Sequence, residues 1–180
     1  MAIVTVTEFN TYSGNFETDS DIVSMKEDIL GTAQEIVKNH LGYDPESGNH
    51  TDYISAIGNN RLYLMAQPIT AVSSVELNGV SVSSDEYTIN EKYLRLKSGV
   101  WPEGDENVKV TYTAGWSALT IPDTIKMVIL QIATLMLEEA GENIGITGKS
   151  FGDNSRTFIN YTNFGKWLQK LDQFRIVRLY

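Results

Sequence analysis

The sequence predicts an α+β protein whose N- and C-terminal helices pack together and carry an inserted small antiparallel β-layer of four to five short strands. Three observations lead to this fold class. Apolar residues recur at steps of three and four near both ends of the chain, which places them on one face of a helix. Between these stretches, apolar and polar residues alternate over short runs, as in half-buried strands. The pair Asn78-Gly79 adds a hairpin signal.

The first helix is expected after Thr18 and Asp21, which have the spacing of a capping box, and Asp19 and Ser20 are also good caps. Its apolar positions share one face: Ile22, Met25, Ile29, Ala33, Ile36, Val37 and Leu41. Gly42 is placed to end this helix, and Pro45 disfavours its continuation. The sequence leaves open whether a strand or a short turn forms in the preceding residues, TVTEFNTYSG.

The β-layer is expected between about residues 59 and 118. Pro68 interrupts its first strand, and Asn78-Gly79 suits a two-residue type I′ turn because both turn positions need positive φ. A second pair of short strands is expected around residues 90–92. The run VKVTYTA alternates cleanly, with Val108, Val110 and Tyr112 on one face.

A very apolar helix follows Pro122 and Asp123, two residues that suit a first helical turn. Its polar positions fall within one stripe of roughly 140°: Lys126, Gln131, Thr134 and Glu138. A helix with one buried side needs an apolar stripe only somewhat over ~100° wide, so this helix must meet partners on more than one side. Either it lies between the β-layer and the first helix, or a neighbouring subunit also covers it.

The chain continues with a loop rich in Gly, Asn, Ser and Thr near residues 141–161. A short amphipathic helix follows and presents one apolar face, formed by Phe164, Trp167, Leu168, Leu171 and Phe174. Between Lys166 and Arg178 there are four bases, including Arg175, and only one acid. Two interpretations compete here. The apolar face packs on helices of its own subunit, or part of it docks on another chain.

Charge is unevenly distributed along this chain of net charge −9. Residues 1–60 contain ten acids and two lysines, whereas residues 121–180 have one more base than acid. An acidic protein is a poor tight binder of nucleic acid, because phosphate contacts need basic side chains. The imbalance is either a solubility charge or a sign that acidic and basic ends meet between subunits. The chain lacks a signal-peptide pattern and a spanning apolar run, so a soluble, intracellular protein is expected.

Few residues are candidates for chemistry. There is no cysteine, which excludes disulfides and thiolate sites. The run NIGITGKS is similar to a phosphate-binding loop, but Asn143 replaces the first required glycine and the run follows a helix. His50 lies near three acids, Asp44, Glu46 and Asp52, but their spacing fails the calcium-loop pattern and favours a solvated loop. No nucleophile–base pair is evident, so the sequence predicts no enzyme, no cofactor and no metal site.

The order of several fragments resembles the tailed-bacteriophage head–tail connector (adaptor) proteins. A helix is followed by R-L-Y-L-x-x-x-P-I-T-x-V-x-S-V-x-L-N-G, then L-R-L-x-x-G-x-W-P, V-x-V-x-Y-T-A-G-W and I-P-x-x-I-K-x-x-I-L-x-I-A. The matched positions include Pro68, Asn78-Gly79, Trp101-Pro102, the Tyr112–Trp116 run and Pro122. The resemblance covers roughly residues 20–140, and none of its pieces is a catalytic signature.

This resemblance implies a structural virion protein located in the neck and assembled in the host bacterial cytoplasm. Such connectors form rings, commonly twelve-fold, beneath the portal protein. DNA passes through the ring without specific binding, and a stopper or tail-completion protein attaches to it; no membrane is involved. The alternatives are another phage neck or tail-completion protein, a non-viral α+β binding module and a hydrolase that uses acidic residues.

The reading along the chain, together with this resemblance, predicts one connector domain over residues 1–180. Residues 1–58 would be mainly helical, 59–118 would form the β-insert, and 119–180 would be helical with the Gly-rich loop. The expected assembly interface consists of Phe164, Trp167, Leu168, Leu171, Phe174, Arg175 and Arg178.

Overall fold

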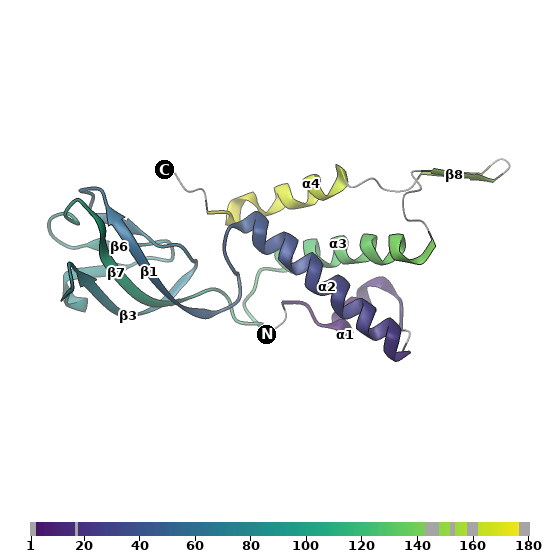
Figure 1. Ribbon diagram of the computed structural model, residues 1–180, viewed down its shortest axis with the longest axis horizontal. Coiled ribbons are helices and arrows are strands. Elements are labelled where there is room, and N and C mark those ends of the chain that lie inside the picture. Colours follow the sequence, from purple (N-terminus) through teal and green to yellow (C-terminus); the bar gives the residue numbers. More distant parts are fainter. Residues whose placement is uncertain (1–2, 17, 143–147, 152–153, 158–161, 177–180) are drawn as a thin grey trace. The chain divides into compact units, whose positions relative to one another are not determined.

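The computed structural model describes residues 3–16, 18–142, 148–151, 154–157 and 162–176, with only the backbone described from 139 to 163 (Figure 1). The chain forms two compact units. One contains residues 1–42 and 122–180, and the other contains residues 43–121. The first unit is mainly helical and the second is built from antiparallel strands. The α+β class is therefore confirmed, while a single connector domain over the whole chain stays a prediction.

The helical unit joins the two ends of the chain. Its elements are α1 (Val6–Ser13), α2 (Ser20–Leu41), α3 (Asp123–Glu142), α4 (Thr162–Leu168) and the 3₁₀-helix η2 (Gln169–Phe174). Two short strands, β8 (Gly148–Phe151) and β9 (Asn154–Thr157), pair as an antiparallel hairpin. This hairpin lies where the sequence indicated only a Gly-rich loop.

Helix α1 was not expected, since the sequence left a strand or a turn open for these residues. Its capping box explains the helix: the backbone N–H of Glu8 donates to the Thr5 hydroxyl, and the Thr5 N–H donates to the Glu8 carboxylate. Before α2 the Thr18–Asp21 box does not form, and the alternative cap Asp19 is confirmed, since its carboxylate accepts from the N–H of Asp21. Gly42 ends α2 with φ 82°, as predicted.

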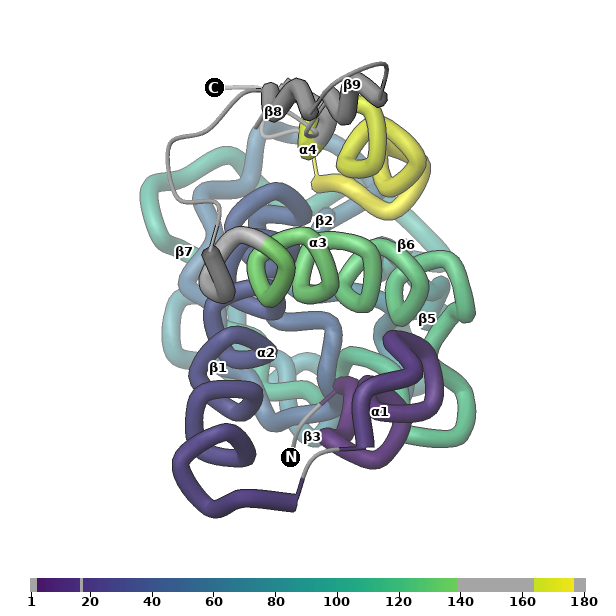
Figure 2. The backbone as a smooth tube through the Cα atoms, turned by 90° about the vertical axis from the view of Figure 1, so that its right-hand side faces the viewer, coloured from purple at the N-terminus to yellow at the C-terminus, as the bar shows by residue number. Residues whose placement is uncertain are grey.

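Helix α3 packs against α1, α2, α4 and η2. This explains why so much of its circumference is apolar: Ile125, Val128, Ile129, Ile132 and Ala133 are fully buried. Helices α4 and α1 lie on opposite sides of α3, as Figures 1 and 2 both show. The expected packing of N- and C-terminal helices is thus confirmed, and other helices supply the several partners that α3 requires.

The β-unit, all of whose residues are described, contains seven strands in two sheets instead of four to five strands in one layer. The first sheet has the order β1-β7-β3-β4 and the second the order β2-β6-β5. Their bounds are β1 (Gly48–Ala56), β2 (Arg61–Tyr63), β3 (Ile69–Leu77), β4 (Val80–Ser81), β5 (Tyr87–Ile89), β6 (Tyr93–Leu96) and β7 (Gly104–Ala114), with the 3₁₀-helix η1 (Ser84–Glu86) between β4 and β5.

Strand β1 corrects the expected boundary, because the β-section begins at residue 48 and not near residue 59. Its sequence, GNHTDYISA, contains few apolar residues, so the alternation is weak. Pairing with β7 along most of its length stabilises it. The other predicted β features are confirmed: Val108, Val110 and Tyr112 are fully buried, and Asn78 and Gly79 have φ of 49° and 78°.

The backbone at the end of β7 explains the run Ala114-Gly115-Trp116 in physical terms. Gly115 has φ 100° and its N–H donates to the Pro68 carbonyl at 2.9 Å. The Trp116 N–H donates to Pro45, and the Trp116 carbonyl accepts from Ser47, both at 2.9 Å. A side chain at Gly115 would collide with the backbone of Glu46. Only glycine therefore lets the chain pass so close to the segment before β1.

Candidate assembly surfaces

The predicted interface residues lie on α4, η2 and the residues that follow them. Leu171 is fully buried, so it packs inside the helical unit and can only support a contact surface from beneath. The other four apolar side chains are half-buried, and Phe164 and Trp167 have ring centroids 6.1 Å apart. Arg175 is exposed, whereas Arg178 lies outside the described residues. The interface assignment as a whole stays a prediction.

The C-terminal segment is fixed to α2 by polar contacts that the sequence did not reveal. His40 Nε2 lies 3.0 Å from Asp172 Oδ1, and these residues are 132 positions apart. The N–H of Ile176 donates to the Leu41 carbonyl at 3.2 Å. Because η2 packs on both α2 and α3, this segment is part of the folded helical unit.

Three exposed bases follow one another along this segment: Lys166, Lys170 and Arg175. Asp172 is the only acid among them, and it contacts His40. We call Lys166, Lys170 and Arg175 the basic segment.

Helix α2 presents the opposite charge. Asp21, Asp28 and Glu35 are exposed and recur every seven residues. Seven residues turn an α-helix by about 700°, only ~20° short of two full turns, so these carboxylates form one row along the helix. We call them the acidic row.

Helix α2 also contains two lysines, but neither stands out from this row. Lys26 is fully buried, and its Nζ donates to Asn10 Oδ1 and to the Asn15 carbonyl, each at 2.9 Å. Lys38 is partly buried and has a partner of its own. The exposed face of α2 is therefore acidic.

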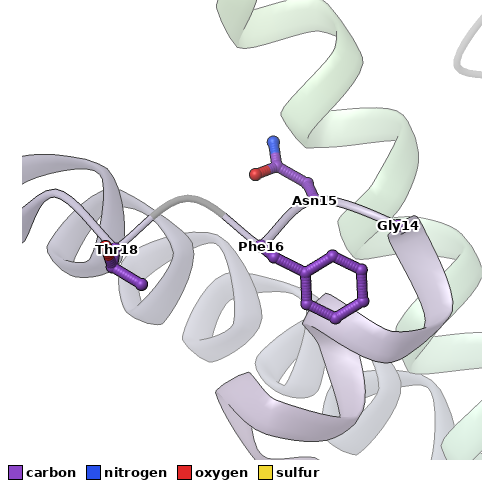
Figure 3. A pocket seen from close by; sticks show the side chains of 4 residues that line it. All are labelled: Gly14, Asn15, Phe16 and Thr18. Carbon is purple, nitrogen blue, oxygen red and sulfur yellow. The ribbon is translucent and has the colours of Figure 1, made fainter.

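Buried Lys26 holds the segment between α1 and α2 in place. This segment borders an open hollow of about 560 Å³, which is lined by Gly14, Asn15, Phe16 and Thr18. Figure 3 shows the side chains of Asn15 and Phe16 extending in different directions from it. The Phe16 side chain is 67% exposed. Among the described residues, those that line the hollow include no acid, base or strong nucleophile.

Of the acidic residues near His50, Asp52 belongs to a hydrogen-bond network inside the β-unit. Asp52 Oδ2 accepts from the Tyr112 hydroxyl at 2.6 Å and from the Met65 N–H at 2.8 Å. The Tyr112 hydroxyl in turn accepts from the Ala66 N–H at 3.0 Å. Burial, followed by the hydrogen bond to Asp52, raises the pKa of Tyr112. The network therefore ties the segment after β2 to strands β1 and β7.

The described residues give little support to a metal site, a phosphate-binding loop or a membrane-spanning helix. They contain no group of three His, Asp or Glu side chains placed to hold a metal ion. Gly148, Lys149 and Ser150 belong to strand β8, so this part of the GKS run does not open a helix as a phosphate-binding loop must. None of the helices in the described ranges combines the length and apolar character needed to cross a bilayer.

The fold and these surfaces define an α+β protein with a helical unit made from both chain ends, an inserted β-unit and charged helical faces. The model of the head completion protein family matches residues 2–171. The chain belongs to this family, which makes it a structural phage protein of the head–tail connector or adaptor kind.

Solved structures share this fold. The chain is similar to a chain in the neck of an empty GTA particle computed with C6 symmetry, with 13% identity, a TM-score of 0.63 and coverage of 99% of this chain and 92% of that one. A chain in the virion of the native gene transfer agent particle has 13% identity, a TM-score of 0.61 and the same coverage. A chain in the native neck computed with C12 symmetry has 14% identity, a TM-score of 0.58 and coverage of 97% and 90%. No curated protein sequence matches the chain.

Proposed function

We propose that the chain is a neck protein of the virion that assembles as a ring beneath the portal, with a stopper or tail-completion protein on its other side. The observation that carries this proposal is the family match over residues 2–171, nearly the whole chain. The fold adds support, because the similar chains come from particle necks computed with C6 and C12 symmetry. A ring with one subunit type requires two different complementary patches on each copy.

The charge of the chain fits passage of DNA through such a ring. A net charge of −9 disfavours tight contact with phosphates. An acidic subunit would therefore let DNA slide through the ring without specific binding. On this proposal the chain acts by shape and assembly and is not an enzyme, and it is made in the host bacterial cytoplasm before it joins the head.

Adding the purified chain to portal-bearing, tailless heads of the same phage tests the proposal. We expect a ring of density at the portal vertex by electron microscopy, together with restored attachment of tails. A matched reaction with the β-unit variant Tyr53→Phe, which changes one exposed hydroxyl, controls for handling of the protein. Binding at another place on the particle, or no binding to heads, would contradict a connector role and favour another neck or tail-completion function.

A further inference from the structure

The acidic row has no compensating cation within the part of its own chain that the structure describes. Among the described residues, the carboxylates of Asp21, Asp28 and Glu35 make no ion pair or side-chain hydrogen bond. At about 1.5 Å per residue, the row extends over roughly 21 Å of helix α2. Three like charges in a straight line repel one another weakly in water, so a ligand that brings complementary cations would relieve this repulsion.

The basic segment is equally uncompensated. Lys166, Lys170 and Arg175 form no ion pair with a carboxylate in the described part of the chain, because the one nearby acid, Asp172, contacts His40. With about 1.5 Å per residue in α4 and about 2.0 Å in the 3₁₀-helix, these bases extend over roughly 16 Å. The two sets of charges therefore have opposite sign and comparable length.

Most of the acidic row lies on a different side of the helical unit from α4. In both Figures 1 and 2, α4 lies on one side of α3, and the N-terminal half of α2 lies on the other side. Asp21 and Asp28 belong to this N-terminal half, so they lie across α3 from α4, whereas Glu35 belongs to the half of α2 whose end contacts η2 through His40 and Asp172. This is the arrangement that a head-to-tail contact between copies requires, since each copy then offers a different patch to each neighbour. In a twelve-membered ring, neighbouring copies are rotated by about 30°, which needs patches on nearly opposite sides.

We propose that the acidic row of one subunit binds the basic segment of the next copy of this chain. This inference rests on the proposed ring and specifies its subunit contact. The half-buried rings of Phe164 and Trp167 lie beside Lys166 and would form the apolar centre of the contact, with the charge pairs around it. A second copy is the occupant that uses both patches at once. DNA would be attracted by the basic segment alone, and an acidic or basic protein partner would fit only one of the two.

Two reversed variants test the contact. The first carries Asp21→Lys, Asp28→Lys and Glu35→Lys, and the second carries Lys166→Glu, Lys170→Glu and Arg175→Glu. In the first variant both patches are basic, and in the second both are acidic, so each variant alone should associate at least about tenfold more weakly than the wild type. Mixed in equal amounts, the two variants are complementary at both contacts. The mixture should therefore form rings in which the two chains alternate.

Controls of matched charge use exposed positions in the β-unit. Asp85→Lys, Glu86→Lys and Glu91→Lys equal the first variant in charge change, and Lys92→Glu with Lys97→Glu approaches the second. Circular dichroism establishes that each variant is folded. Mass photometry, alone and on portal-bearing heads, then measures assembly at low and high salt, and the wild-type contact should weaken as salt rises.

Separate outcomes decide the inference and the proposed function. Rescue of ring formation in the mixture, with unaffected controls, supports this contact. If folded variants assemble like the wild type, or if both fail and their mixture fails as well, the contact is wrong while the ring itself stands. A wild-type chain that remains monomeric both alone and on portal-bearing heads would overturn the proposed ring and this contact together.

Discussion

Removing one buried hydroxyl tests whether the Asp52–Tyr112 network stabilises the β-unit. Tyr112→Phe keeps the ring in place and deletes two hydrogen bonds: the one to Asp52 at 2.6 Å and the one from the Ala66 N–H at 3.0 Å. Tyr112 is fully buried and Asp52 is 9% exposed, so water cannot replace the lost partners easily.

The expected loss follows from the two bonds. A hydrogen bond to a charged group contributes about 1.5–3 kcal/mol, and a buried N–H left without an acceptor costs about 1–3 kcal/mol. Some relaxation will occur, so we expect the free energy of unfolding of the β-unit to fall by about 2–4 kcal/mol. Tyr53→Phe removes the same atom from a side chain that is 53% exposed. This variant should change the free energy of unfolding of the β-unit by less than about 0.5 kcal/mol.

Urea unfolding followed by fluorescence measures this difference, since Trp101 is fully buried in the β-unit. Hydrogen exchange provides a local measurement, because the amides of Met65 and Ala66 both donate to the network. Exchange at Ala66 should accelerate most in Tyr112→Phe. If the two tyrosine variants unfold at the same urea concentration, the network does not stabilise the unit and this reasoning is wrong.

Three further predictions concern backbone geometry, pH and the C-terminal segment. Gly115→Ala should destabilise the chain by about 2 kcal/mol or more, because φ is 100° there and the new methyl group would meet the backbone of Glu46. Gly31→Ala, in an open helical position, should stabilise the chain by about 0.5–1 kcal/mol. Thermal unfolding measures both changes, and melting temperatures that move in the same direction for the two variants would contradict this prediction. Burial, opposed by a hydrogen bond with Gln67, raises the pKa of Tyr43 from 10.0 to about 12, so the unfolded state loses this proton first and stability should fall as pH rises from 10 towards 12. Tyr43→Phe should flatten that fall in urea midpoints measured across this range, and an unchanged slope would argue against it. Truncation before Phe164 should lower the melting temperature of the helical unit, because it removes the buried side chain of Leu171. A truncated unit that is equally stable but no longer forms rings would contradict this and show that the segment acts in docking alone.

The helices and hairpins that could be predicted are those whose signals are local. Apolar spacing identified α2 and α3, Gly42 marked a helix end, and Asn78-Gly79 marked a turn that the structure confirms. Strand β1 was missed because its stability comes from pairing with β7, some 60 residues away, and not from its own composition. Helix α1 was missed because its capping box, Thr5 and Glu8, was not recognised.

The sequence did not predict those features of the candidate surfaces that depend on contacts between residues far apart in the chain. Asp52 stood in a plausible acidic cluster, but only the fold shows that its carboxylate accepts from Tyr112. Leu171 belonged to an evident amphipathic face, yet periodicity cannot say whether such a face packs internally or on a partner. The contact between His40 and Asp172 joins residues that no local pattern connects. In contrast, the sequence alone predicted an acidic N-terminal part and a basic C-terminal part, because the charge of each part follows directly from its residues.

The symmetry and position of the assembled chain on a portal-bearing head test the central claim most directly. A reconstruction of tailless heads incubated with the purified chain should show a closed ring directly beneath the portal, with the helical units of neighbouring copies in contact through α2 and the α4–η2 segment. Heads that gain no such ring, or that carry the chain as isolated copies away from the portal vertex, would contradict the account.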